Sequence, residues 1–262
     1  MKKQDMSRET GSATGGRKVI IANWKMNLSV MQSLGFIKKI VKSKNEVVIA
    51  APYTFLCELG KHLKQKKIKL AGQNVSQFDS GAYTGDVSAK MLKEEGCAYC
   101  LVGHSERRIY FNEKDKEINK KIIQLLKYKI RPVLCIGESS SERAKGLTAK
   151  VLNKQLKLAL TGIKKCENIL IAYEPIWAIS TFVKCKTKCS ARMSDITAAH
   201  QEIKKMLKVL YPKKFSKIKI LYGGTVNEIN SKDIFKLPLV DGVLVGGASL
   251  NISSFNAIIK SS

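Results

Sequence analysis

The chain has 262 residues, 44% of them hydrophobic, which is enough for one or two domains with a large core. No apolar run approaches the roughly 20 residues of a membrane-spanning helix, and the polar residues 1–17 lack the apolar region of a signal peptide. The net charge is +26, but only seven of the 47 basic residues are arginines and no aromatic residues interleave with the lysines, which favours a solvated surface over specific nucleic-acid binding.

In chain order, residues 1–17 predict a flexible extension and residues 18–262 a single catalytic domain. Most of the β-type runs in that domain are continuous and apolar, as expected for strands buried on both faces of a parallel sheet. Eight of them can be recognised, at residues 18–22, 46–50, 68–72, 99–103, 131–136, 169–173, 217–221 and 240–245.

Segments with helical spacing lie between these runs. Residues 116–129 place their isoleucines and leucines on one face and their lysines on the other, and a second helix is expected after Ser194, its predicted N-cap. The alternation of eight strands and helices predicts an α/β fold, a closed (β/α)8 barrel, and no G-x-G-x-x-G fingerprint follows the first strand to favour a dinucleotide-binding sheet.

Five segments place polar or glycine residues just after a β-type run, at residues 23–25, 103–108, 173–177, 222–225 and 245–250. In a barrel, the carboxyl ends of all strands meet on one face, and this face carries the chemistry. The glycines at 223–224 and 246–247 follow the seventh and eighth strands and the second pair is expected to open the last helix, a place where backbone N–H groups bind phosphate. The pattern therefore predicts a phosphorylated small substrate.

Three ionisable residues stand at strand ends. His104 is positioned for acid–base work, whereas His62 and His200 fall in predicted helices and are expected at the surface. Glu174 precedes Pro175, which fixes the backbone, and partial desolvation would strengthen its carboxylate as a base. Lys25 can neutralise a phosphate or a developing oxyanion.

Seven cysteines without even spacing indicate a reducing compartment, and the cytoplasm is the default. Two cysteine pairs have spacings compatible with zinc: Cys97 with Cys100, and Cys185 with Cys189. We expect neither to bind metal, and Cys97 is expected at the end of a helical segment, away from Cys100 in a strand. The sequence thus offers a base, a polarising group, a cation and a phosphate-binding loop, and it has no metal or cofactor motif. This combination suits proton abstraction beside a carbonyl, so no cofactor is expected.

Seven segments also resemble the triosephosphate isomerase family, in order and over nearly the full chain. They are Asn-Trp-Lys-Met-Asn at 23–27, Gly-Ala-Tyr-Thr-Gly at 81–85, Val-Gly-His-Ser-Glu-Arg-Arg at 102–108, Cys-Ile-Gly-Glu at 135–138, Ala-Tyr-Glu-Pro-Ile-Trp-Ala-Ile at 172–179, Tyr-Gly-Gly at 222–224 and Val-Gly-Gly-Ala-Ser-Leu at 245–250.

The resemblance implies a single-domain TIM barrel that interconverts dihydroxyacetone phosphate and D-glyceraldehyde 3-phosphate through an enediolate, in glycolysis and gluconeogenesis. It implies that Glu174 moves the carbon proton, that neutral His104 polarises the carbonyl, and that Lys25 and Asn23 stabilise the enediolate. The remaining residues that it implies are Ser180, Thr225, Gly246 and Gly247 as phosphate ligands, Ser105, Glu106 and Tyr222 as supporting groups, and Thr84 in a dimer loop at 73–86 that inserts beside Asn23 and His104 of a second subunit.

One segment departs from the family pattern. After Trp177-Ala178-Ile179 the family's lid reads Gly-Thr-Gly-Lys, whereas this chain continues Ser180-Thr181-Phe182 and is several residues longer. A lid of this kind excludes water, so its change puts closure and phosphate binding in question. An alternative function is therefore a catalytically weakened barrel kept to bind phosphate or polyanions, although the presence of Lys25, His104 and Glu174 together argues against it.

Overall fold

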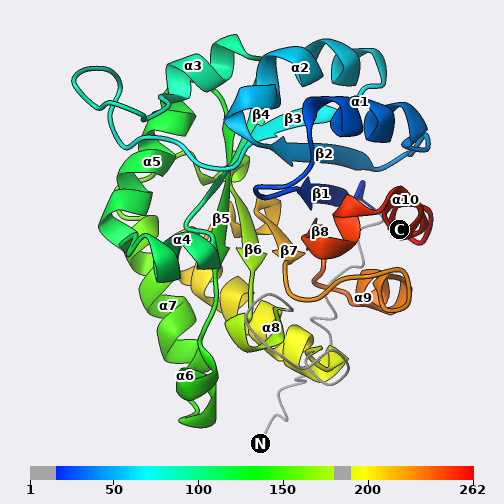
Figure 1. Cartoon of the computed structure of the whole chain (residues 1–262). Coiled ribbons are helices and arrows are strands. Elements are labelled where there is room, and N and C mark those ends of the chain that lie inside the picture. Colours follow the sequence, from blue (N-terminus) through cyan, green and yellow to red (C-terminus); the bar gives the residue numbers. More distant parts are fainter. Residues whose placement is uncertain (1–15, 180–189) are drawn as a thin grey trace, which may run out of the picture.

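The computed structural model describes residues 16–179 and 190–262, and shows a ring of parallel strands surrounded by helices (Figure 1). Each strand pairs in parallel with the next, and β1 pairs with β8 to close the barrel. The eight strands are β1 Val19–Asn23, β2 Glu46–Ala51, β3 Lys69–Gly72, β4 Cys97–Val102, β5 Arg131–Ile136, β6 Leu170–Tyr173, β7 Lys219–Tyr222 and β8 Gly242–Val245. The predicted α/β barrel is confirmed.

Helices cover the outside of this ring (Figure 1). The α-helices are α1 Val30–Lys39, α2 Leu56–Gln65, α3 Ala89–Glu94, α4 Ser105–Tyr110, α5 Asp115–Lys127, α6 Ser140–Ala144, α7 Thr148–Ala159, α8 Met193–Leu210, α9 Ser231–Lys236 and α10 Ile252–Lys260. Short 3-10 turns are η1 Tyr53–Phe55, η2 Cys166–Asn168, η3 Ile176–Ala178, η4 Phe215–Lys217 and η5 Gly247–Leu250.

Alternation along the strands divides the core into two layers. Every second strand residue, such as Val19 and Ile21 of β1 or Leu170 and Ala172 of β6, fills the inside of the barrel. The residues between them pack outward against the helices, as Ile20 and Ala22 do. Since side chains alternate with a period of two, the next inward residue after Ile21 is Asn23, and the next after Ala172 is Glu174. The packing pattern thus directs these polar groups to the carboxyl end of the barrel interior.

Several local predictions were wrong. The helix expected after Ser194 starts at Met193, with Arg192 as its N-cap, because the Asp195 carboxylate accepts the Arg192 backbone N–H at 3.2 Å. Cys97 does not end a helix but opens β4, where pairing with β3 extends the strand two residues before the predicted start. The last glycine pair leads into η5, and α10 begins only at Ile252.

The structure describes only the last two residues of the predicted N-terminal extension. Of the expected extension at 1–17, residues 1–15 lie outside the described residues, and Gly16 and Arg17 are exposed before β1. No helix in the described part of the chain is long and apolar enough to cross a membrane.

Candidate active site

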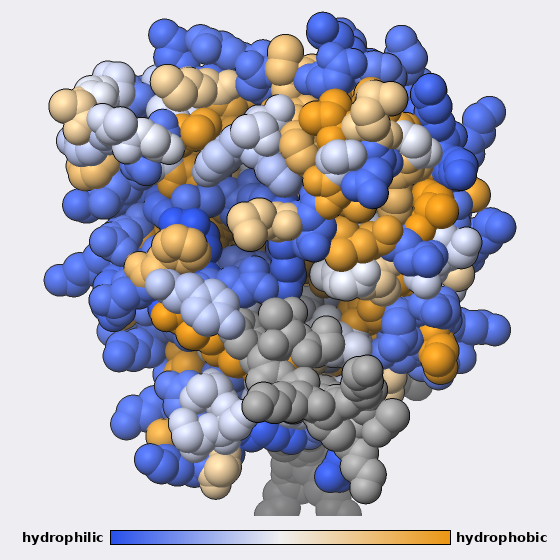
Figure 2. Space-filling model, in the orientation of Figure 1, coloured by the Kyte–Doolittle hydropathy of each residue, from blue (hydrophilic) through white to orange (hydrophobic). Residues whose placement is uncertain are grey.

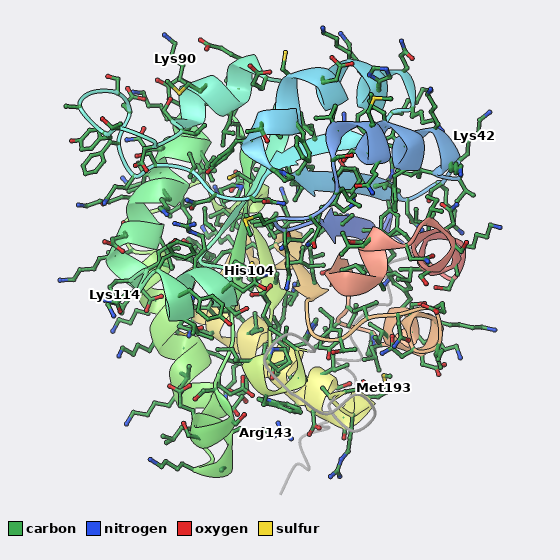
Figure 3. All side chains as sticks on the ribbon, viewed as in Figure 1. Lys42, Lys90, His104, Lys114, Arg143 and Met193 are labelled. Carbon is green, nitrogen blue, oxygen red and sulfur yellow. The ribbon has the colours of Figure 1, made fainter. Side chains whose placement is uncertain are left out.

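One pocket opens at the carboxyl ends of the strands, and Figure 3 places His104 near the centre of the ring. Hydrophilic residues predominate around this face in the space-filling view (Figure 2). The pocket collects residues from five strand ends and the loops that follow them. Its lining consists of Asn23, Lys25, His104, Glu174, Ile179, Gly223, Gly224, Thr225, Val226, Asn227, Leu244, Gly246, Gly247 and Ala248.

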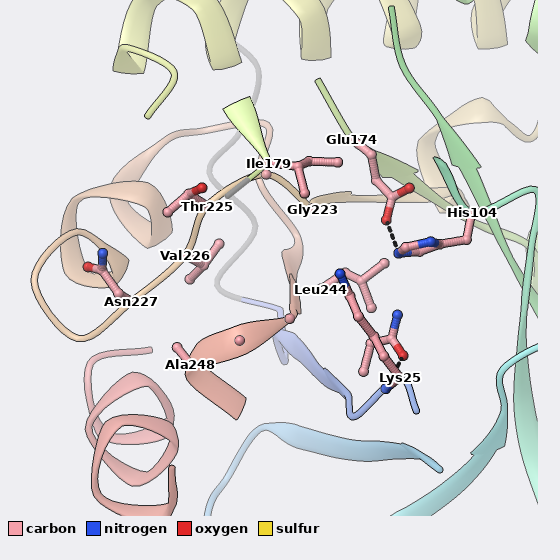
Figure 4. Close-up of a pocket in the computed structure, with 14 residues that line it drawn as sticks. Lys25, His104, Glu174, Ile179, Gly223, Thr225, Val226, Asn227, Leu244 and Ala248 are labelled. Carbon is pink, nitrogen blue, oxygen red and sulfur yellow. Dashed lines mark hydrogen bonds and ion pairs between the residues drawn. The ribbon is translucent and has the colours of Figure 1, made fainter. Parts of the chain in front are cut away.

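Glu174 extends the inward face of β6 and is only 2% exposed. Its Oε2 accepts the Ser105 backbone N–H at 3.0 Å, and its Oε1 lies 3.2 Å from Nε2 of His104 (Figure 4). Two glycines make room for Glu174, one beside its side chain and one beside its backbone. A Cβ on Gly223 would lie 2.9 Å from the Glu174 Cγ, and one on Gly137 would lie 1.9 Å from the Glu174 carbonyl oxygen. The carboxylate is therefore buried and held by hydrogen bonds at the pocket wall.

His104 caps the short helix α4 and is 7% exposed. Its Nδ1 accepts the Glu106 backbone N–H at 3.3 Å. An imidazole nitrogen that accepts a hydrogen bond carries no proton, so the proton of the neutral ring is on Nε2. That nitrogen points to the pocket and to Glu174 (Figure 4), and so offers a donor to a substrate oxygen.

Lys25 has a left-handed backbone, with φ of 53°, which is a strained conformation for a lysine. Hydrogen bonds hold it: the Asn23 Oδ1 accepts the Lys25 backbone N–H at 3.1 Å, and the Gln73 amide donates to the Lys25 carbonyl at 2.9 Å. The Lys25 Nζ lies 2.5 Å from Glu106 Oε1. The Lys25 Cε would lie 3.6 Å from a Cβ on Gly246, so the cation stands beside the glycine-rich loop after β8. Strain of this kind is typical of functional sites.

The glycine pairs after β7 and β8 are explained by different features of the structure, close packing in the first and backbone donors in the second. A Cβ on Gly224 would lie 2.2 Å from the Tyr222 hydroxyl, so this position needs glycine because the tyrosine ring packs under it. A Cβ on Gly247 would contact nothing within 4 Å, and this residue opens η5, whose first N–H groups lack intrahelical partners. Backbone donors that suit an anion are thus found after β8.

Thr225 lines the pocket, but its hydroxyl is engaged. Both its Oγ1 and its backbone N–H donate to the Ala178 carbonyl, at 2.7 and 3.0 Å. The predicted ligand Ser180 and the remainder of the predicted lid to Cys189 lie outside the described residues.

Supporting contacts continue behind the pocket. The fully buried Glu138 accepts hydrogen bonds from the Tyr173 hydroxyl and, at 2.7 Å, from the Trp177 indole. Trp177 also stacks against Arg143, whose guanidinium carbon is 3.8 Å from the ring centroid. Arg143 pairs in turn with Asp195 at 3.0 Å. Sequence reasoning missed this chain of contacts, because its members come from separate elements of the barrel.

The other histidines and the cysteines lie elsewhere. His62 is half-exposed on α2. The prediction that His200 lies at the surface was wrong, because this residue is fully buried in α8 and hydrogen-bonds to the Leu239 carbonyl at 3.0 Å. Cys97 and Cys100 are free and buried in β4, while Cys185 and Cys189 lie outside the described residues. No cluster of His, Cys, Asp or Glu suited to a metal ion occurs within residues 16–179 and 190–262.

The loop at 73–86 projects from the barrel and is internally ordered. Phe78 and Tyr83 stack in parallel with centroids 3.8 Å apart, and Asp79 accepts hydrogen bonds from Lys127 and Tyr128 of the α5 region at 2.6 and 2.7 Å. Thr84 is exposed, in the turn that the hydrogen bond from the Asp86 N–H to the Tyr83 carbonyl closes at 3.0 Å. A second hollow beside the pocket at the strand ends shares Asn23, Lys25 and His104 with it.

Comparisons with known proteins agree with this geometry. Residues 18–262 match the family model described as triosephosphate isomerase. The chain is 43% identical over 251 residues to the triosephosphate isomerase of Aquifex aeolicus, covering 94% of this chain and 99% of that protein. It is 44% identical over 252 residues to that of Alkaliphilus metalliredigens, with 93% and 99% covered. The crystal structure of the Bartonella henselae triosephosphate isomerase superposes with a TM-score of 0.85 at 34% identity, covering 94% of this chain and 98% of that chain.

Proposed function

The chain belongs to the triosephosphate isomerase family, and on that premise we propose how its strand-end residues interconvert dihydroxyacetone phosphate and D-glyceraldehyde 3-phosphate. The reaction is an intramolecular aldose–ketose isomerisation of glycolysis and gluconeogenesis. It moves one proton between neighbouring carbons and one between neighbouring oxygens. The alternative, a weakened barrel retained for binding, has no support in these comparisons.

Glu174 acts as the base. Its buried carboxylate removes the proton from the carbon next to the carbonyl and returns it to the adjacent carbon, and the C–H electrons form the enediolate in between. Substrate displaces the carboxylate from its contacts with the Ser105 N–H and with His104. The Ser105 backbone N–H therefore holds the Glu174 carboxylate before substrate binds.

His104 and Lys25 stabilise the charge that develops on oxygen. The Nε2–H of neutral His104 donates to the carbonyl oxygen and moves protons between the two oxygens. Lys25 supplies a full positive charge beside the enediolate, with Asn23 fixing its backbone and Glu106 its ammonium group. Because these groups are oriented before substrate arrives, little reorganisation is needed during the reaction.

The phosphate occupies the side of the pocket near η5. Gly246 and Gly247 provide backbone N–H groups there, and the Lys25 ammonium offsets the dianion's charge. Thr225 contributes once its hydroxyl leaves the Ala178 carbonyl. Ser180 completes this set in our proposal, and Tyr222 supports it by packing beneath Gly224.

The observation that carries the assignment is the 3.2 Å contact between a buried carboxylate and the Nε2 of His104 in a pocket that also holds a lysine. The purified chain should convert glyceraldehyde 3-phosphate in an assay that couples the ketone product to an auxiliary dehydrogenase. His104→Gln should lower kcat by about 10²–10⁴-fold, the usual contribution of acid–base catalysis. His62→Gln, on the half-exposed face of α2, is the matched control and should keep full activity.

A homodimer is the assembly we propose. The ordered 73–86 loop would enter the second hollow of another subunit, which is lined by Met26 and Phe111 as well as by Asn23 and His104. Met26 is 96% and Phe111 66% exposed in the single chain, and burial of such side chains stabilises an interface. Light scattering should give twice the chain mass, and Thr84→Arg in the exposed turn of this loop should yield monomers with reduced activity. A fully active monomer would contradict the proposal.

The proposed compartment is the cytoplasm. Five cysteines in the described part of the chain are free, and four of them are buried within the fold. Such thiols suit a reducing environment. Cell fractionation followed by the isomerase assay tests this placement.

A further inference from the structure

A second set of hollows lies at the opposite end of the barrel, where the strands begin. One, with a volume of about 730 Å³, is bounded by α2, the start of β3 and the turn before β4. The other, of about 500 Å³, lies between the end of α1 and the starts of β2 and β3. Arg17, Lys67 and Ile68 line both, so the two hollows are adjoining parts of one depression, which we call the basic groove.

Cations surround the basic groove. Arg17, Lys61, Lys64, Lys67 and Lys69 border the larger hollow. Lys42, visible at the periphery in Figure 3, and Lys66 border the smaller one. Only Glu94 and Glu95 contribute carboxylates to the lining.

These seven cations have no acidic partner within salt-bridge distance in the described part of the chain. Among residues 16–179 and 190–262, none of them forms a salt bridge, whereas Lys25, Arg107, Arg108, Lys121 and Arg143 all do. Lys66 donates only to backbone carbonyls, those of Lys38 at 2.6 Å and Ile40 at 3.3 Å. A concave surface with one sign of charge concentrates its field and attracts ligands of the opposite sign.

The floor of the smaller hollow is apolar. Ile40, Val41, Val47 and Ile68 line it, and no aromatic residue lines either hollow. Single-stranded nucleic acids bind through stacking on aromatic rings, which this groove does not offer. A cationic rim above aliphatic side chains instead suits a ligand that alternates carboxylates with aliphatic groups.

The chain's own N-terminal segment is a poor match for this surface. It enters β1 through Arg17 at the groove, but residues 1–15 carry Lys2, Lys3 and Arg8 against Asp5 and Glu9. Its charge therefore has the same sign as that of the groove.

We propose that the basic groove binds an acidic, leucine-bearing extended segment of a partner protein. Carboxylates of the segment pair with the rim lysines, and its aliphatic side chains contact the floor. The site lies at the opposite end of the strands from the catalytic pocket, so partner and substrate bind at the same time. This inference is independent of the isomerase reaction.

Fluorescence anisotropy with the full chain tests the proposal, with a fluorescein-labelled peptide of repeated Glu-Glu-Leu as the probe. In about 0.15 M salt, where long-range attraction between exposed charges is screened, the peptide should bind measurably. The variant Lys61→Gln/Lys64→Gln/Lys67→Gln should weaken binding about 10-fold, since each exposed pair contributes modestly. The matched control is Lys150→Gln/Lys154→Gln/Lys157→Gln on α7, away from α2 in Figure 1, and it should bind as the parent does.

Unchanged isomerase kinetics in both triple variants show that each is folded. A peptide of repeated Glu-Glu-Ser, with the same charge but no leucine, should bind several-fold more weakly than the leucine peptide. Equal weakening by the two triple variants would overturn the proposal, as would equal binding of the two peptides. So would tighter binding of an oligodeoxythymidylate through the same three lysines, which would make the occupant a nucleic acid.

Discussion

At the scale of single residues, three lysines have a left-handed backbone conformation, and the reason differs between the strand end and the helix end. Lys25, Lys67 and Lys129 all have φ between 53° and 59°. Lys129 follows the end of α5 and lies on the surface, where the Ile130 N–H donates to the Leu125 carbonyl at 2.9 Å and closes the helix. Glycine is the usual residue at such a position. Lys25, in contrast, is held in the strained conformation by side-chain hydrogen bonds at the catalytic pocket.

Lys129→Gly should therefore raise the free energy of unfolding by about 0.5–1 kcal/mol, the relief of left-handed strain less the extra chain entropy of glycine. Urea denaturation measures it, and kcat should not change. Lys25→Gly relieves the same strain but removes the cation, so it should be as stable as the parent or more so and nearly inactive. A destabilised Lys129→Gly variant would contradict this account of the helix end.

Glu174→Asp tests the base at the same scale. Shortening the side chain by one methylene withdraws the carboxylate by about 1 Å, and misplacement of that size can cost roughly 100-fold in rate. We expect kcat to fall by that order while the thermal midpoint stays close to that of the parent. Turnover at the parent's rate would show that Glu174 is not the base.

At the scale of elements, the barrel joins segments that are remote in sequence. Arg143 of α6 stacks on Trp177, just before the segment outside the described residues, and pairs with Asp195 in the first turn of α8, just after it. One side chain thus connects the described residues on either side of that segment, Trp177 before it and Asp195 after it. Its planar guanidinium suits both a stacked and a paired contact.

Arg143→Ala should raise KM by up to about 10-fold, because a cation–π contact and an exposed ion pair together contribute about 1–2 kcal/mol. Steady-state kinetics that separate KM from kcat measure the effect. Arg143→Lys keeps the charge but loses the planar stack, so it should recover only part of the loss. Equal KM values for the parent and Arg143→Ala would mean that the contacts with Trp177 and Asp195 do not support substrate binding.

At the scale of the whole molecule, burial makes stability depend on pH through His200. This residue is fully buried, and its Nε2 has no hydrogen-bond partner among the described residues. Burial lowers the pKa of His200 from 6.5 to about 4. The unfolded chain therefore takes up a proton near pH 6.5 that the folded chain refuses until about pH 4. The stability that neutral His200 supports is complete above pH 6.5 and is lost as pH falls toward 4.

Between pH 7 and pH 5, protonation of His200 in the unfolded chain should lower the free energy of unfolding by about 2 kcal/mol, since one pKa unit corresponds to 1.36 kcal/mol. Urea titrations at the two pH values should show a smaller difference for His200→Gln, which cannot take up the proton. His62→Gln, from the half-exposed histidine, should behave as the parent does. An undiminished pH effect in His200→Gln would assign the loss to other groups.

The overall charge has its own consequence. With a net charge of +26, the protein should attract DNA weakly at low ionic strength. Binding should be independent of base sequence and vanish by about 0.2 M salt, as counterion release requires. Anisotropy titrations at several salt concentrations measure this, and tight, salt-resistant binding to one sequence would contradict it.

The sequence by itself determined the barrel and the identity of its polar strand-end residues. Apolar runs of strand length alternate with amphipathic helices, and the segments around Lys25, His104 and Glu174 keep their order and residue types. These signals are local, because each depends on neighbours a few positions apart. Exact element ends were less predictable, since pairing with an adjacent strand, as at Cys97, or a carboxylate cap, as at Asp195, sets them.

Only the tertiary structure decided which residues meet. It buries His200, expected at the surface, because the inner face of α8 packs on the barrel. It packs the Tyr222 ring against Gly224, where a larger residue would not fit. It joins Glu138, Trp177, Arg143 and Asp195, which come from separate helices and turns. It also gathers Arg17 and six lysines around the basic groove, where the composition alone predicted a dispersed surface charge. Such contacts depend on distances between remote segments, which closure of the barrel fixes and no local pattern encodes.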